Sequence, residues 1–159
     1  MDSQREDLFR LIKGVSRSFY LSIRFLPQET RRTVAIAYGL ARAADTLADT
    51  DIVAWERRAE ALKRFRQMLA EKWVGAAKWE DLARLFAGHA QLPTENQLMT
   101  RLPGFIHAFN ALPKLEQDLV EQVLSTLIQG MVWDLETFSG ADRKVVALES
   151  AEDLDRYTY

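Results

Sequence analysis

The sequence contains no cysteine, so neither disulfide bonds nor thiol chemistry contributes to the protein. This absence is compatible with a reducing compartment, and we expect a cytoplasmic protein. No apolar run approaches the roughly 18 residues that a membrane-spanning helix requires. The first residues, MDSQREDLFRLIK, also lack the apolar segment of a signal peptide. We therefore expect a soluble chain, with peripheral contact to a membrane as an open alternative.

Glycine and proline are scarce, with 7 and 4 copies among 159 residues. Together with abundant Ala, Leu, Arg and Glu, this scarcity favours an all-helical protein over a sheet protein. A dominant charge is lacking too, since the net charge of −2 gives no electrostatic reason to expect a nucleic-acid partner. With 48% hydrophobic residues and no repeats or linker, residues 1–159 are expected to form one domain with its own core.

Hydrophobic periodicity predicts helices over residues 3–13, 33–50, 52–72, 78–90 and 114–138. Pro27 and Glu29 predict the first turn of the helix that continues through 33–50, because Pro and acidic residues are both favoured there. Pro93, Pro103 and Pro113 mark later boundaries between elements.

Four polar residues follow one face of the helix predicted over 33–50, namely Tyr38, Arg42, Asp45 and Asp49. At 100° per residue they fall within an arc of roughly 60°. The rest of this segment is small or apolar, which reverses the usual pattern of an apolar stripe on a polar background. The pattern predicts a buried helix whose polar stripe lines an internal cavity.

The stripe has the residue types of a site for a metal and a diphosphate. Asp45 and Asp49 are one turn apart, about 6 Å along the axis, so their charges repel unless a cation lies between them. Carboxylate oxygens suit Mg²⁺, which completes its shell with waters and substrate phosphates. Arg42 offers a planar fork of donors for phosphate oxygens, and Tyr38 adds a phenol. The alternative is a solvated Asp-x-x-x-Asp pair, because that spacing alone is common.

A further carboxylate, Asp134, falls within an apolar face of the helix predicted over 114–138. The residues of this face are Val120, Val123, Leu124, Leu127, Met131 and Phe138. A lone carboxylate there must be paired, neutralised or directed into a cavity. The sequence leaves structural pairing and a role in lining the site equally open.

Five motifs, in this order along the chain, resemble those of the squalene and phytoene synthase family, the head-to-head prenyl transferases. They are Ser16-Arg-Ser-Phe-Tyr20, Leu26-Pro27, Tyr38-x-x-x-Arg42-x-x-Asp45-Thr-x-x-Asp49, Gly130-Met-x-x-Asp134-Leu and Asp155-Arg-Tyr157-Thr-Tyr159. Residues 15–50 carry the most specific part. The resemblance implies an all-α helical bundle around a central cavity, like other isoprenoid synthases.

The resemblance also implies which residues act in catalysis. Asp45 and Asp49 resemble the first aspartate-rich Mg²⁺ site of the family. Tyr38 and Arg42 resemble contacts to the diphosphate and to the reaction intermediate. Tyr157 resembles a tyrosine near the reacting carbons.

Substrate-binding residues are implied in the same way. One segment resembles the part of the family that closes over a prenyl diphosphate, and it comprises Val15, Ser16, Arg17 and Ser18. Phe19 is expected beside the pocket for the prenyl chain, and Asp134 is expected to contact substrate.

For a complete family member, the resemblance implies Mg²⁺-dependent head-to-head condensation of two prenyl diphosphates through a cyclopropylcarbinyl diphosphate. NADPH supplies hydride if the product is squalene. The Ser-Arg-Ser-Phe and Ile-Arg-Phe-Leu-Pro segments resemble squalene-type members more closely than phytoene synthases. Squalene-type members condense farnesyl diphosphate, whereas phytoene synthases use geranylgeranyl diphosphate.

The chain departs from the family pattern at one point, because no second Asp-x-x-x-Asp motif follows the tyrosine segment. We therefore expect residues 1–159 to form the N-terminal half, or slightly more, of a prenyl synthase domain that is truncated. Such a portion is expected to be inactive alone. Two alternatives are a non-catalytic helical fragment that binds a diphosphate or a partner, and a purely structural helical interaction module.

Overall fold

A computed structural model describes residues 11–14, 17–72, 75–86, 93–139, 150–152 and 155. Within these residues all regular secondary structure is helical, which confirms the all-α prediction. The helices are α2 (Arg17–Arg24), α3 (Gln28–Asp49), α4 (Trp55–Ala70), α5 (Ala76–Phe86), α6 (Pro93–Thr100), α7 (Leu102–Asn110) and α8 (Lys114–Phe138). Among the described helices, none is both long enough and apolar enough to cross a membrane.

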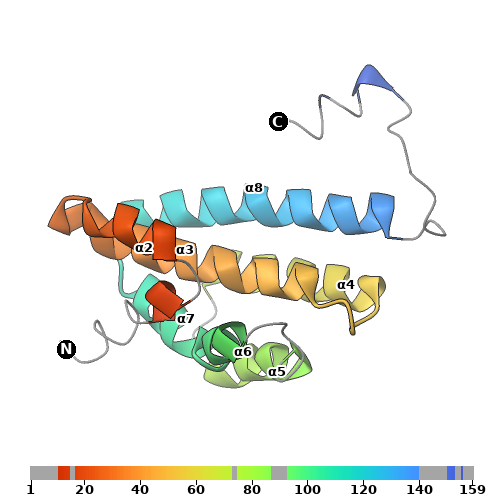
Figure 1. The fold of residues 1–159 in the computed structure, drawn as a ribbon, viewed down its shortest axis with the longest axis horizontal. Helices are drawn as coiled ribbons and strands as arrows, with labels where there is room; N and C mark the ends of the chain where they lie inside the picture. Colours follow the sequence, from red (N-terminus) through yellow and green to blue (C-terminus); the bar gives the residue numbers. More distant parts are fainter. Residues whose placement is uncertain are drawn as a thin grey trace.

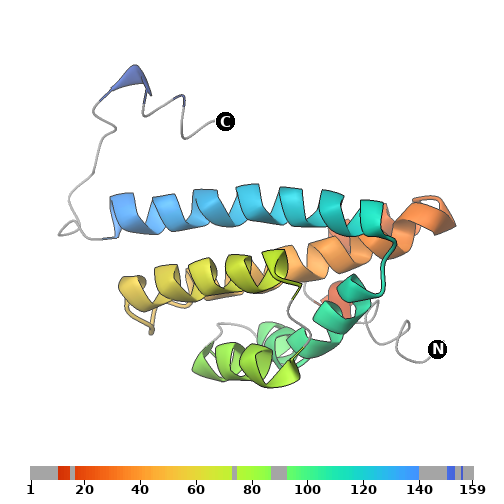
Figure 2. The ribbon, with the colours of Figure 1, turned by 180° about the vertical axis from the view of Figure 1, so that it is seen from behind.

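The helices lie in layers around the pair formed by α3 and α4. The long helix α8 runs along one side of this pair and contacts both members, as Figures 1 and 2 show from opposite directions. The shorter helices α5, α6 and α7 cover the other side (Figure 1). The short helix α2 packs against α3. Helix α3 therefore contacts helices on several sides, which suits its content of small and apolar residues.

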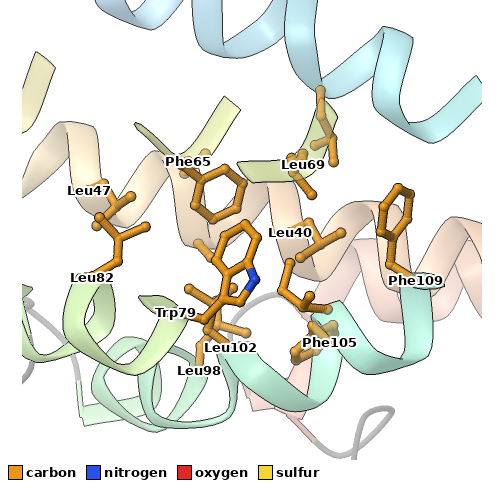
Figure 3. Close-up of a cluster of buried hydrophobic side chains, with 14 of the residues drawn as sticks. Leu40, Leu47, Phe65, Leu69, Trp79, Leu82, Leu98, Leu102, Phe105 and Phe109 are labelled. Atoms are coloured by element: carbon orange, nitrogen blue, oxygen red, sulfur yellow. The ribbon is translucent and has the colours of Figure 1, made fainter. Parts of the chain in front are cut away.

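The hydrophobic core fills the space between the α3–α4 pair and the shorter helices. Figure 3 shows side chains from all these helices converging there, among them Leu40, Phe65, Trp79, Leu98 and Phe105. The Phe65 and Trp79 rings meet edge to face, with centroids 5.2 Å apart and planes at 84°. Because each large apolar side chain gains about 1.5–3 kcal/mol on full burial, this cluster holds α5 and α7 against the central pair.

Gly39 permits an unusually close approach of α7 to α3. A Cβ atom at this position would lie 2.0 Å from Cε1 of Phe105. Any side chain other than hydrogen would therefore displace the Phe105 ring. This contact fixes α3 one residue after Tyr38, the first residue of the polar stripe.

The helix boundaries follow the sequence prediction closely where periodicity is strong. Helix α8 spans the predicted 114–138, and α3 begins directly after Pro27. Helix α4 is shorter at both ends than the predicted 52–72, because residues 51–53 form a turn before it and residues 71–72 form a turn after it. Helix α5 begins before the predicted residue 78, and the predicted end at residue 90 lies outside the described residues, as does most of 3–13.

Prolines do more than separate elements in the middle of the chain. Pro93 begins α6, and Pro103 lies in the first turn of α7, a position where its missing N–H costs no hydrogen bond. These two short helices, and α2, were not predicted as helices. Their apolar periods are too short to separate them from loops by pattern alone.

Candidate functional site

Three of the four residues of the polar stripe lie where α3 borders α2 and α8. The opposite sides of α3 are buried against its neighbours, through residues such as Ile36, Leu40 and Leu47. Tyr38, Arg42 and Asp45 line a cavity of about 420 Å³. This volume falls within the range of about 300–1,000 Å³ that is common for ligand pockets.

The walls of the cavity are apolar, whereas its floor is polar. The lining residues other than Tyr38, Arg42 and Asp45 are Phe19 of α2, Val34, Ala37 and Ala41 of α3, and Val123, Leu124, Leu127 and Met131 of α8. An apolar wall accommodates a hydrocarbon, and a guanidinium beside a carboxylate accommodates a charged head group with its counterion. The arrangement therefore suits an amphipathic ligand with an anionic end.

Within the described residues the cavity is open on one side. Val123 is 61% exposed and Leu127 is 38% exposed, although both line the cavity. Among the described residues, no element covers this edge of α8. The predicted apolar face of α8 is unevenly buried, since Val120 and Leu124 are buried while Val123 and Leu127 are exposed.

An aromatic pair borders the cavity. The Phe19 ring stacks on the Tyr38 ring with centroids 4.1 Å apart and planes at 16°. This contact links α2 to the stripe of α3. Phe19 thus lies at the cavity where the sequence placed it, and its role beside a prenyl chain stays a prediction.

Arg42 is held between two carboxylates. Its Nη1 donates a hydrogen bond to Oδ2 of Asp45, one turn along α3. Its Nη2 donates to Oε1 of Glu95 on α6, at 2.5 Å. The Nε atom is buried and has no hydrogen-bond partner within the part of the chain that the structure describes.

Glu95 is a component of this cluster that sequence reasoning did not identify. An acidic residue in the first turn of a helix is ordinary, because it stabilises the helix dipole, so its sequence position carries no distinguishing signal. Its pairing with Arg42 depends on α6 packing against α3, which spacing along the chain cannot show.

Asp49 ends the stripe and lies outside the cavity lining, in an exposed position. Partial burial, and secondly the negative charge of Asp45, raise the pKa of Asp49, while Arg42 opposes the shift. The two carboxylates therefore repel one another, as the sequence predicted for a pair without a cation.

The donor set fits Mg²⁺ only as a partial site. Within the described residues, no group of three or more His, Cys, Asp or Glu side chains is arranged to hold a metal ion. Mg²⁺ often binds through one or two carboxylates and takes its remaining ligands from water and substrate phosphates. Asp45 and Asp49 fit that mode, and their assignment as metal ligands stays a prediction.

Asp134 is exposed on α8 and is not among the cavity-lining residues. Partial burial raises the pKa of Asp134. No ion pair of Asp134 is present among the described residues. The structure therefore brings Asp134 neither into the cavity nor into a structural pair, and its predicted substrate contact stays untested.

The remaining predicted site residues fall beyond what the structure describes. Val15, Ser16 and Tyr157 lie outside the described residues. Arg17 and Ser18 begin α2, but their side chains are not described. The predicted closing segment and the predicted tyrosine near the reacting carbons therefore stay predictions.

The chain is similar to known proteins over most of its length. A family model described as squalene/phytoene synthase matches residues 12–159. The squalene synthase of Saccharomyces cerevisiae is 24% identical over 151 residues, which are 95% of this chain and 31% of the yeast protein. The bifunctional lycopene cyclase/phytoene synthase of Phycomyces blakesleeanus is 25% identical over 134 residues, which are 84% of this chain and 21% of that protein.

Solved structures agree with the sequence relatives. Two ligand complexes of TcSQS, a squalene synthase, superpose on this chain with TM-scores of 0.72 and 0.73 and identities of 26% and 25%. The matches cover 98% and 99% of this chain but 40% of each solved chain. The chain thus spans less than half the length of the relatives that it matches.

Proposed function

Since the squalene/phytoene synthase model matches nearly all of it, this chain belongs to the squalene/phytoene synthase family, and we propose that it supplies one half of a prenyl diphosphate site. The complete protein would be a squalene-type synthase, a farnesyl diphosphate farnesyltransferase. One observation carries the proposal: Tyr38, Arg42 and Asp45 form the polar floor of an otherwise apolar cavity.

The polar floor would bind the diphosphate. Arg42 presents a guanidinium, which matches phosphate oxygens through paired N–H donors. Asp45 and Asp49 would hold Mg²⁺ next to it. Bound there, Mg²⁺ would act as a Lewis acid that neutralises the departing diphosphate.

The apolar walls would hold the prenyl chain and shield from water the carbons that lie against them. Loss of the diphosphate leaves an allylic cation, which water would otherwise trap. The stacked rings of Phe19 and Tyr38 present π-electron density that stabilises positive charge. Attack by the double bond of a second prenyl diphosphate, with loss of a proton as the three-membered ring closes, would give a cyclopropylcarbinyl diphosphate. Loss of the second diphosphate and rearrangement of the resulting cation, followed by hydride transfer from NADPH, would give squalene.

Phytoene synthase is the second candidate, and a specific observation favours keeping it. The phytoene synthase relative is 25% identical to this chain and the squalene synthase relative 24%, so identity does not separate the two. A phytoene synthase would use geranylgeranyl diphosphate at the same floor and would need no hydride.

Product analysis separates these candidates. The native protein, with whatever polypeptide follows Tyr159, is incubated with farnesyl or geranylgeranyl diphosphate, Mg²⁺, and with or without NADPH. We expect squalene from farnesyl diphosphate only when NADPH is present. Phytoene from geranylgeranyl diphosphate would establish the second candidate instead. Mg²⁺-dependent binding of either substrate without turnover would identify a non-catalytic binding module.

A further inference from the structure

Glu95 is a buried carboxylate that the proposed chemistry does not use. It lies in the first turn of α6 with an exposed fraction of 8%, and the other buried polar residues described are Thr46 and Thr50. A carboxylate at this depth is costly unless it is paired, so its partner indicates its role. Glu95 pairs with Arg42, whose Nη2 lies 2.5 Å from Oε1 of Glu95.

The two carboxylates around Arg42 occupy different places relative to the cavity. Asp45 lines the cavity together with Arg42, whereas Glu95 is not among the lining residues. Glu95 therefore holds the guanidinium from the protein side, and Asp45 holds it from the cavity side. In the proposed function Asp45 is a ligand of Mg²⁺, so Glu95 is the anchor that stays with Arg42 when the site is filled.

We propose that Glu95 is a positioning residue for diphosphate recognition, which fixes the Arg42 guanidinium at the cavity floor before the substrate binds. This inference rests on the proposed role of Arg42 in the preceding subsection. A free Arg side chain carries about 2 kcal/mol of rotamer entropy, and ordering it in advance lowers the cost of binding. A guanidinium has more N–H donors than its two carboxylate contacts use, so donors remain for phosphate oxygens.

A purely electrostatic role of Glu95 has the opposite consequence. The negative charge of Glu95 lies close to a site for an anion and repels it. If Arg42 kept its position without Glu95, removal of this charge would strengthen diphosphate binding. If Arg42 loses its position, binding weakens. Weaker diphosphate binding after removal of the Glu95 charge therefore indicates a positioning role, and stronger binding indicates a purely electrostatic role.

The first test measures the Kd of inorganic pyrophosphate in the presence of Mg²⁺ by calorimetry for the full chain and for Glu95→Gln. We expect affinity to fall by about tenfold, the factor that one displaced charge-assisted hydrogen bond accounts for. Glu116→Gln is the matched control. Like Glu95, Glu116 links its own helix, α8, to α3, because it accepts a hydrogen bond from Thr33. Glu116 does not line the cavity. The Kd of pyrophosphate for Glu116→Gln should stay within about twofold of the wild-type value, as expected for a substitution away from the site.

A second variant guards against loss of folding in Glu95→Gln. Glu95→Asp keeps the charge but withdraws it by one methylene group, so the pairing with Arg42 is stretched. Positioning by Glu95 requires weaker pyrophosphate binding in this variant as well. An unchanged Kd in Glu95→Asp would mean that only the charge matters and would overturn the proposal. Helix content and the melting temperature of each variant are followed by circular dichroism.

A double-mutant cycle tests whether Glu95 acts through Arg42. In an Arg42→Gln background, Glu95→Gln should cause no further loss of pyrophosphate affinity. An equal loss in both backgrounds, or tighter binding by Glu95→Gln alone, would refute positioning while the proposed function stands. Absence of Mg²⁺-dependent pyrophosphate binding in the wild-type chain would refute the proposed function and this inference together.

Discussion

At the scale of single residues, the site depends on how α3 divides its surface between packing and the cavity. Gly39 and Tyr38 are neighbours in the chain but face different directions, about 100° apart around the helix axis. Gly39 is buried against Phe105 of α7, and Tyr38 stacks on Phe19 at the cavity. A change on the packed side is therefore transmitted directly to the residues of the floor.

Gly39→Ala should destabilise the protein, although alanine is the better helix former. The added Cβ would lie 2.0 Å from the Phe105 ring, so the ring or the helix must shift. We expect a loss of about 1–3 kcal/mol in the free energy of unfolding, the usual cost of overpacking a core. Chemical denaturation measures it. Gly104→Ala is the control, because nothing lies within 4 Å of its Cβ position. That variant should be neutral or stabilised, and equal losses in both variants would contradict the packing argument.

Asp49→Asn should stabilise the protein at neutral pH in the absence of divalent cations. Burial and Asp45 raise the pKa of Asp49 in the fold, so the folded state holds this proton more tightly than the unfolded state. The contribution of Asp49 to the free energy of unfolding is thus most favourable at low pH, and it is lost as the pH rises through the pKa of Asp49 in the folded state. Removal of one like-charge pair at i and i+4 gains about 0.2–0.5 kcal/mol.

The gain from Asp49→Asn should disappear near and below pH 3.8, the ordinary pKa of the group, where the wild-type carboxyl becomes neutral. Thermal unfolding at several pH values in metal-free buffer tests this dependence. A variant that is less stable than wild type at neutral pH would show that Asp49 has a stabilising partner instead.

Residue-level prediction from sequence succeeded where helical periodicity was sufficient. Tyr38, Arg42 and Asp45 meet in one cavity because 3.6 residues per turn place them on one face of one helix. Glu95 and the contact at Gly39 depend on which helices pack against α3, and no local pattern encodes that. Asp49 follows the same periodicity but extends past the end of the cavity.

At the scale of elements, the C-terminal end of α3 is held by α4. The last carbonyl groups of a helix lack partners within the helix. Nη1 of Arg58 donates a hydrogen bond to the Ala48 carbonyl at 2.5 Å, and the Arg58 side chain is only 13% exposed. This contact holds the turn of α3 that carries Asp49, so the geometry of the predicted Mg²⁺ ligands depends on α4.

Arg58→Met should loosen this end of α3 while it preserves most of the apolar packing of the side chain. We expect a loss of about 1.5–3 kcal/mol in the free energy of unfolding, as for hydrogen bonds to charged groups. Arg57→Met, at the exposed neighbouring position, should change stability by no more than about 0.5 kcal/mol. Faster amide hydrogen exchange near Ala48 in the Arg58 variant alone would locate the effect. Unchanged exchange there would show that Arg58 does not hold the turn.

The elements themselves were predictable in proportion to their length. Helix α8, of 25 residues, was predicted with both ends correct. Helices α6 and α7, of 8 and 9 residues, were missed because two turns show too little periodicity and each contains a proline. Their stability comes from packing against α3 and α5, which the sequence does not display.

At the scale of the whole molecule, the described helices leave one side of the α3 cavity open. Helices α5, α6 and α7 seal the core face of the central pair, whereas α2 and α8 border the cavity without closing it. The all-α bundle was predictable from composition and periodicity. The open edge was not, because the same apolar residues of α8, such as Val123 and Leu127, read as core in the sequence.

The central claim is that α3 supplies a Mg²⁺-dependent diphosphate site, and calorimetric binding of farnesyl diphosphate tests it most directly. Titrations with and without Mg²⁺ are compared for the wild-type chain and for the variant that combines Asp45→Asn with Asp49→Asn. We expect wild-type binding that requires Mg²⁺, and loss of that binding in a double variant that remains folded. Equal affinity in both proteins, whether or not Mg²⁺ is present, would contradict the claim and leave α3 as a purely structural helix.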